Sequence, residues 1–84
     1  MNYVIESVRH RDGSVHEREE RRKGQRVVFA VCDVGFSMIY VYPDDDNKIV
    51  RTSAVEEIDV GSDDVVVTTQ NTVYTFRKIT EVAE

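Results

Sequence analysis

The chain of 84 residues has one cysteine, Cys32, one proline and no tryptophan. A single cysteine cannot form an internal disulfide, and it cannot supply a zinc site built from several thiolates. No apolar run approaches the roughly 18 residues that a membrane-spanning helix needs. The first residues, 1–6, lack a basic region followed by an apolar run, so we expect no signal peptide. These absences predict a small soluble domain in the cytoplasm.

The sequence also lacks the patterns of common enzyme sites. It has no Ser-His-Asp set in a recognisable arrangement, no phosphate-binding loop and no glycine-rich dinucleotide motif. Glu56 and Glu57 are adjacent, and adjacent residues of a strand point to opposite faces, so the two carboxylates would not converge. We therefore expect a protein that is not an enzyme and that needs no cofactor.

Charge is unevenly distributed along the chain. The formal net charge is −5, yet residues 9–23 hold six basic and four acidic side chains. An acidic body disfavours nonspecific binding to nucleic acid or to anionic lipid. The basic excess of this segment leaves one place where a polyanion could bind.

Alternating apolar residues predict a β-hairpin over Val65–Phe76, with Gln70-Asn71 as its turn and Asn71 as the residue that tolerates positive φ. This register groups valines with aromatic residues on one face, whereas a one-residue slip would oppose them to threonines. The expected cross-strand pairs are Asp64–Arg77, Val65–Phe76, Val66–Thr75, Val67–Tyr74 and Thr68–Val73.

A second strand pair is expected from Arg26–Cys32 and Phe36–Tyr42, joined by a turn at Val34-Gly35. Both faces of this pair are largely apolar, which is typical of a sandwich or a small closed barrel. The expected pairs are Val27–Tyr42, Val28–Val41, Phe29–Tyr40, Ala30–Ile39, Val31–Met38 and Cys32–Ser37.

Further strands are expected over Tyr3–Arg9, whose core face is ambiguous, and over Lys48–Ser53 and Val55–Val60. A kink or one helical turn near Ser53–Glu56 could separate the last two. Short strands with turn signals every eight to twelve residues predict an all-β fold in a single domain, 1–84. We expect a five- to six-stranded antiparallel barrel or sandwich of SH3-like type.

Residues 9–25 form a highly charged segment with almost no apolar stripe. Asp12-Gly13 is a hairpin turn signal that would place His10 opposite Val15. A short helix over Glu17–Lys23 and partial disorder are the alternatives. We favour a mobile loop or a frayed hairpin.

The C-terminal half carries a pattern of polar and aromatic residues. It reads Arg51-Thr52-Ser53-x-Val55, followed by Thr69-x-Asn71-Thr72-x-Tyr74-x-Phe76. This pattern is similar to one in short, uncharacterised proteins of bacteria and their phages. The resemblance implies a small β-barrel with no known chemistry and supplies no catalytic residue. The charged residues 9–25 have no counterpart in it.

Three groups of residues could bear on metal binding or thiol chemistry. His10 and His16, with Glu17 or Asp12, could hold a metal if a hairpin brought them together, but zinc sites usually show tighter spacing, and we expect no metal there. The run 44–46 is acidic but lacks the glycine and glutamate positions of a calcium loop, so we expect a solvated turn. Cys32 lies in an apolar strand and is expected to be an inert buried thiol.

An aromatic platform for nucleic-acid bases is conceivable on Tyr40, Tyr42 and Phe36. The nucleic-acid site would then combine Tyr40 and Tyr42 with basic residues of the charged segment, and it would be flanked by Arg26, Lys48 and Arg51. Those basic residues are Arg18, Arg21, Arg22 and Lys23. Strand aromatics mostly serve packing, which is the interpretation we prefer. The favoured function is a non-enzymatic module that binds another protein or self-associates; the alternative is a nucleic-acid-binding barrel.

Overall fold

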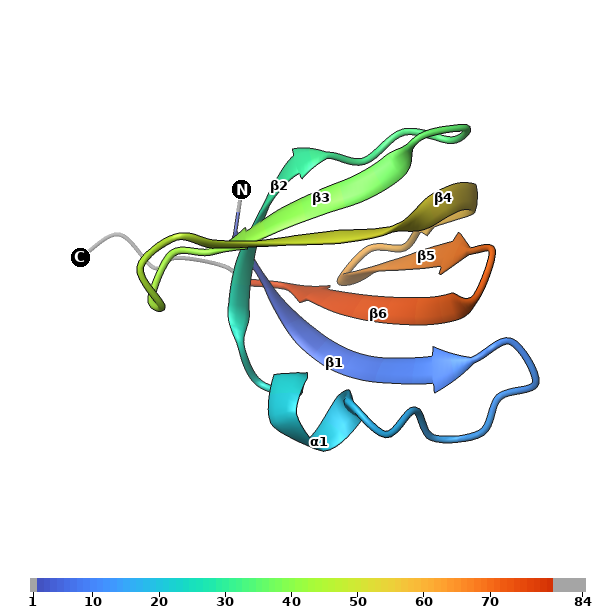
Figure 1. Ribbon diagram of the computed structural model, residues 1–84, viewed down its shortest axis with the longest axis horizontal. Coiled ribbons are helices and arrows are strands. Elements are labelled where there is room, and N and C mark those ends of the chain that lie inside the picture. The colour runs from blue at the N-terminus through green and yellow to red at the C-terminus, as the bar shows by residue number, and fades with distance from the viewer. Residues whose placement is uncertain (1, 80–84) are drawn as a thin grey trace.

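Six antiparallel strands close into a barrel in the computed structural model, which describes residues 2–79 (Figure 1). The strands are β1 (Asn2–His10), β2 (Arg26–Val31), β3 (Ser37–Tyr42), β4 (Lys48–Val60), β5 (Asp64–Thr69) and β6 (Thr72–Lys78). Each strand pairs with its neighbour in sequence, and β1 pairs with β6 to close the barrel. One short helix, α1 (Glu19–Arg22), lies beside β1 (Figure 1). The prediction of a small all-β barrel is confirmed.

Inward-facing side chains fill the barrel with an apolar core. Its buried members are Ile5, Val8, Val27, Met38, Tyr40, Tyr42, Val55, Val65, Val67, Tyr74 and Phe76. Phe76 is the centre of an aromatic cluster, with ring centroids 4.8 Å from Phe29 and 5.8 Å from Tyr40, both edge-to-face. Such edge-to-face pairs stabilise a core beyond the area they bury.

The β5–β6 hairpin has the register expected from its alternation of side chains. Val65 pairs with Phe76, Val67 with Tyr74, and the outer Asp64–Arg77 pair is also present. The turn is closed by side-chain bonds, because the Thr72 N–H donates to Thr69 Oγ1 at 3.1 Å and that hydroxyl donates to the Thr72 carbonyl at 3.0 Å. The expectation that Asn71 adopts a positive φ is wrong. The non-glycine residues of 2–79 with positive φ are Asp46 and Asn47, in the turn before β4.

A β-bulge determines which side chains of β1 face the core. In β1, Ile5 pairs with Phe76 and Ser7 with Thr75, so Glu6 is an extra residue and both Ile5 and Val8 point into the core. The bulge thus resolves the ambiguity of the core face of this strand.

A bulge also shifts the β2–β3 pair. Phe29 pairs with Tyr40 as expected, but Val31 pairs with Ile39 instead of Met38, so Ala30 is the extra residue. The expected Ala30–Ile39 and Val31–Met38 pairs are therefore wrong.

The two strands expected between residues 48 and 60 are one bent strand, β4. Its first part, as far as Ala54, pairs with β3, and its second part, from Val55, pairs with β5. Register shifts lie on both sides of this change of partner, and they bend the strand without the helical turn considered near Ser53–Glu56.

The charged segment is folded, which corrects the expectation of a mobile loop over 9–25. Arg9 and His10 belong to β1, and the Asp12-Gly13 turn leads to a bridge between Arg9 and Val15. The expected pairing of His10 with Val15 is wrong by one residue. The helix alternative, proposed over 17–23, is confirmed in the shorter helix α1.

Candidate functional site: an arginine-lined pocket

A buried carboxylate anchors α1 against β1. Glu19 Oε1 accepts hydrogen bonds from the Val8 N–H at 3.1 Å and from Arg9 Nε at 3.0 Å. The chain beyond the helix is held as well, because the Gly24 N–H donates to the Ile5 carbonyl at 2.8 Å. The helix has almost no apolar stripe, so it is not held by apolar burial. It is held by the buried Glu19 carboxylate, which can be buried because it is hydrogen-bonded.

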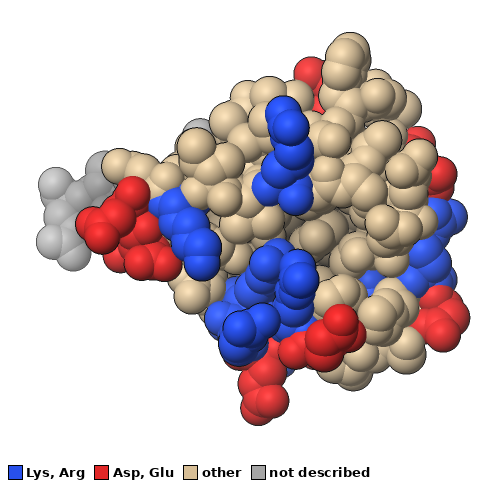
Figure 2. Space-filling model, in the orientation of Figure 1, with Lys and Arg blue, Asp and Glu red and all other residues tan. Residues whose placement is uncertain are grey.

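The anchored helix presents arginines to a pocket of about 250 Å³. We call it the arginine pocket, and its polar lining includes Arg18, Arg22, Arg51, Asn71, Thr72 and Tyr74. Arg18 is the residue directly before α1, and Arg22 is the last residue of the helix. Arg51 comes from β4. Figure 2 shows Lys and Arg side chains on two sides of a hollow in this face of the molecule.

The guanidinium groups of the arginine pocket carry uncompensated charge. Arg9, Arg11 and Arg26 form ion pairs with carboxylates, whereas within residues 2–79 no acidic side chain lies within 4.0 Å of the guanidinium of Arg18, Arg22 or Arg51. Glu17 also lines the pocket, but its carboxylate lies 3.3 Å from His10 Nε2.

Two tyrosine hydroxyls adjoin these cations. Arg22 Nη1 donates a hydrogen bond to Tyr40 Oη at 3.2 Å. Burial raises the pKa of Tyr40, and burial raises the pKa of Tyr74 although the nearby Arg22 charge acts in the opposite direction. Both phenols therefore stay protonated at neutral pH. Tyr74 is a neutral hydroxyl in the wall of the pocket, suited to hydrogen-bond a ligand oxygen.

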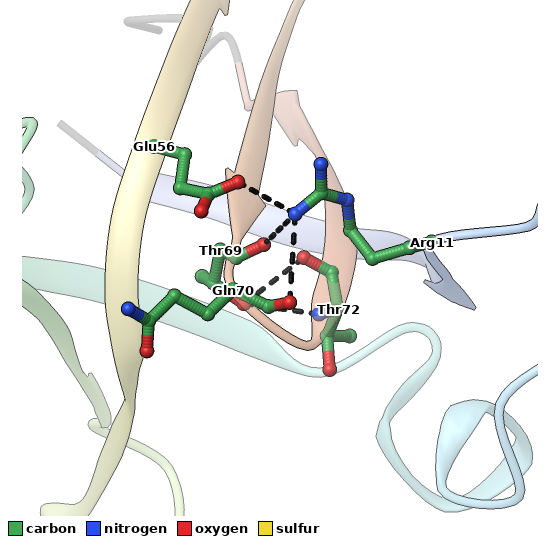
Figure 3. A network of polar contacts seen from close by, with 5 residues as sticks. All are labelled: Arg11, Glu56, Thr69, Gln70 and Thr72. Atoms are coloured by element: carbon green, nitrogen blue, oxygen red, sulfur yellow. Dashed lines mark hydrogen bonds and ion pairs between the residues drawn. The ribbon is translucent and has the colours of Figure 1, made fainter.

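A polar network fixes the β5–β6 turn beside the pocket (Figure 3). Arg11 Nη1 donates to Glu56 Oε1 at 2.6 Å and to the Thr69 carbonyl at 3.0 Å. The same nitrogen lies 3.4 Å from the carbonyl of Gln70. Glu56, considered above as one of a carboxylate pair, thus joins the Asp12-Gly13 turn to β4. This network holds the turn that supplies Asn71 and Thr72 to the pocket.

A second hollow of about 200 Å³ shares Arg22 with the arginine pocket. Arg21, Lys48 and Tyr42 also line it. The Tyr42 hydroxyl is buried and makes no hydrogen bond within the described part of the chain.

The structure brings together only some of the residues that were combined into a nucleic-acid site: Arg22 bonds to Tyr40, and Arg21 and Arg22 line the second hollow with Tyr42. Arg18 and Arg22 line the arginine pocket, Arg21 lines the second hollow, and Lys23 lies at neither. Tyr40 is 0% exposed and Tyr42 5% exposed, so neither ring can stack on a base in this structure. Both rings pack in the core, as the preferred interpretation expected.

The other candidate residues have ordinary surroundings. Asp44 accepts two hydrogen bonds from Arg26, at 2.9 and 3.0 Å, so part of the acidic turn forms an ion pair. Burial raises the pKa of the Cys32 thiol, and the neighbouring Asp33 carboxylate acts in the same direction. A raised pKa opposes the thiolate form that a nucleophile requires. Phe36 is 65% exposed just before β3.

Sequence reasoning missed several groups of the site. Glu19, Asn71, Thr72 and Tyr74 were not proposed as functional residues. The alternation of valines with aromatic residues in the β5–β6 hairpin predicted that Tyr74 lies in the core. It did not predict that Tyr74 lies at the edge of the core, where it lines the pocket. Only barrel closure, which joins β6 to β1, brings these residues beside α1.

Comparisons with known proteins assign no family. Neither a scan against family models nor searches of curated proteins and of solved structures gave a match for this chain. Within residues 2–79, no helix has the length and apolar character to span a membrane. The geometry of the arginine pocket is therefore the main guide to function.

Proposed function

We propose that this protein is a non-enzymatic interaction module whose arginine pocket binds an acidic segment of a partner protein. The observation that carries the proposal is the group of Arg18, Arg22 and Arg51 around one hollow, three guanidiniums that have no carboxylate partner among residues 2–79. Guanidinium groups bind carboxylate and phosphate oxygens through paired hydrogen bonds. A carboxylate or phosphorylated side chain would supply the missing counter-charge.

The size of the pocket favours a short acidic segment over a nucleic-acid strand. A volume of about 250 Å³ suits one or two anionic side chains. Proteins that bind single strands use long basic grooves and exposed aromatic platforms. Here Tyr40 and Tyr42 are buried, and the net charge of −5 repels a polyanion more strongly than it repels a peptide with few charges.

One observation supports the nucleic-acid alternative. The two hollows share Arg22, and together they place Arg18, Arg21 and Lys48 around adjoining depressions. A backbone with regularly spaced phosphates would follow such a row of cations. Its affinity would fall steeply with salt, because phosphate contacts release counterions.

The test is a fluorescence-anisotropy titration with three labelled probes at low and at high salt. The probes are a short peptide with Glu, Asp and phosphoserine, the same peptide with Gln, Asn and Ser, and a single-stranded RNA. We expect the acidic peptide to bind and the neutral peptide not to bind. Arg51→Gln should weaken binding about tenfold or more, since hydrogen bonds to charged groups contribute roughly 1.5–3 kcal/mol.

Arg77→Gln is the matched control, because this exposed arginine pairs with Val4 at the other end of β6. It should leave peptide affinity unchanged. Equal losses in Arg51→Gln and Arg77→Gln, or no binding of the acidic peptide at low salt, would contradict the proposal. Tighter binding of the RNA than of the peptide would favour the alternative.

A further inference from the structure

We propose that His10, His16 and Glu17 form a binding site for a divalent transition-metal ion such as Zn²⁺. One nitrogen of each imidazole and one carboxylate oxygen lie within 4.8 Å of one another. Two imidazoles and a carboxylate are a ligand set that zinc accepts, with a fourth position open to water or to another ligand. The proposal is carried by other observations than those of the arginine pocket, although His16 and Glu17 also line that pocket.

The turn after β1 places both histidines on the same face. A two-residue turn at Asp12-Gly13 would set His16 opposite Arg9 and so on the other face from His10. The observed bridge joins Arg9 to Val15, and the His16 N–H donates to the Val8 carbonyl at 3.1 Å. This shift of one residue exchanges the faces, because side chains alternate along a strand. The imidazoles consequently stack, with ring centroids 4.6 Å apart.

The backbone around the site is held by its own hydrogen bonds. The His10 N–H donates to the Ser14 carbonyl at 2.9 Å, and the carboxylate of Asp12 accepts from the Ser14 N–H at 2.9 Å. Gly13 has a φ of 89°, which a glycine adopts without strain. A fixed backbone lowers the entropy lost when ligands gather around an ion.

The carboxylate of Glu17 faces both histidines. Its Oε2 lies 3.3 Å from His10 Nε2 and 3.9 Å from His16 Nδ1. Zinc bonds to nitrogen and oxygen are about 2.0–2.2 Å long, so small side-chain rotations must bring the three atoms around the ion. The side chains of His10 and Glu17 are 41% and 74% exposed and can rotate, whereas that of His16 is 14% exposed and stays in place.

The local hydrogen bonds select the coordinating nitrogen of His16. The Arg18 N–H donates to His16 Nδ1 at 3.0 Å, so this nitrogen carries a lone pair. It is also the nitrogen nearer to Glu17 Oε2. A metal on Nδ1 would release the Arg18 amide, which is at the surface and can bond to water.

The surrounding charge limits which ion fits. Basic residues of the segment oppose a cation, so an ion with strong affinity for imidazole is required. Zn²⁺, Ni²⁺ and Cu²⁺ meet this condition. Mg²⁺ and Ca²⁺ prefer several oxygen ligands and should not bind here.

The test is a calorimetric titration of the untagged, chelator-treated protein with ZnCl₂. We expect one saturable site per chain. His10→Ala and His16→Ala should each lower the affinity at least about tenfold, since the loss of groups that merely support metal ligands already costs 10- to 100-fold. Cys32→Ser is the matched control and should bind Zn²⁺ like the original chain, because Cys32 is the only thiol in the sequence.

Nuclear magnetic resonance gives a second readout. The chain has two histidines, so the imidazole signals can be assigned from the two single variants. Zn²⁺ should shift both imidazoles and the Arg18 amide, whereas MgCl₂ should shift none of them. Glu17→Gln, at an exposed position, should keep the fold and weaken binding. Unchanged affinity in a His10→Ala/His16→Ala double variant, binding lost only in Cys32→Ser, or no saturable binding up to millimolar Zn²⁺ would overturn the proposal.

Discussion

The β5–β6 hairpin and the charged segment 9–25 are held to the barrel by different forces. In the hairpin, Val65, Val67, Tyr74 and Phe76 are all buried, and their alternation sets the register. In the charged segment, the only buried residue is Glu19, which is held by hydrogen bonds. Apolar periodicity thus specifies a strand pair, while a single well-partnered carboxylate can dock a helix that has no apolar stripe.

The difference extends to function. The hairpin is a source of stability, and it contributes only its turn and Tyr74 to the arginine pocket. The charged segment supplies two of the three arginines of the arginine pocket and all three residues of the proposed metal site. Changes in the hairpin should therefore act on stability first, and changes in the charged segment on binding first.

The largest effect is expected from Phe76→Ala, which removes a fully buried ring. Large-to-small changes of this kind cost about 3–5 kcal/mol, so we expect this variant to be largely unfolded; Phe76→Leu should keep the fold at a smaller cost. Phe36→Ala, at a ring 65% exposed, is the control and should change stability little. Urea unfolding of the three variants gives the free energy of unfolding of each and so the order of their stabilities. Equal losses for Phe36→Ala and Phe76→Ala would contradict the placement of the core.

Glu19→Ala should lower the free energy of unfolding by about 1–3 kcal/mol, because it leaves the Val8 N–H without its partner. Glu20→Ala, at the exposed neighbouring position, should have little effect. Hydrogen exchange of the Val8 amide should accelerate in the first variant only. The same variant should lose affinity for the acidic peptide, since Arg18 and Arg22 are positioned by the helix. Peptide binding at full affinity would show that the anchor is not needed.

Gly13→Ala should cost about 1 kcal/mol, because the left-handed φ of 89° disfavours a side chain. The added Cβ would meet no atom within 4 Å, so the cost is conformational and not steric. Gly13→Asn is the matched variant and should cost less, since Asn tolerates this region better. Thermal unfolding of both variants measures the difference. If Ala and Asn behave alike, the turn differs from the one described.

The smallest effect is expected at the exposed Asp12. Hydrogen bonds from the Ser14 hydroxyl and N–H hold the pKa of Asp12 below its usual value of 3.8. A lowered folded-state pKa stabilises the fold above the unfolded pKa, and this stabilisation is lost as pH falls through the folded value. Asp12→Asn should remove that contribution to the pH dependence below about pH 4. A carboxyl NMR titration that gives an unshifted or raised pKa for Asp12 would contradict the turn geometry.

Much of the fold was predictable because alternation is a local property. The β5–β6 register followed from valines and aromatics two residues apart, and Phe29 was correctly placed opposite Tyr40. The core face of β1 was left open and the β2–β3 register beyond Phe29 was wrong, because bulges add one residue at Glu6 and at Ala30. Their positions depend on closure between β1 and β6, and no short stretch of sequence contains that information.

Less of the candidate site was predictable, because it joins distant parts of the chain. Arg18 and Arg22 were proposed from local charge alone, together with Tyr40 and Tyr42 as exposed rings. Both rings are buried, and Arg22 meets the hydroxyl of Tyr40 instead of its face. Arg51 was considered only as a flanking residue. The position of α1, and with it of Arg18 and Arg22, depends on the Glu19 anchor, and the turn with Asn71 and Thr72 depends on the contacts of Arg11. Neither polar contact produces a periodic pattern in the sequence.

The central claim is that the charged segment and β4 together build an anion site. It is tested most directly by following all arginine Nε–H signals by NMR during titration with the acidic peptide. The account predicts that the signals of Arg18, Arg22 and Arg51 shift together and saturate at one peptide per chain, while that of Arg77 stays unchanged. Small, unsaturable shifts spread over all arginines would show only general charge attraction and would contradict it.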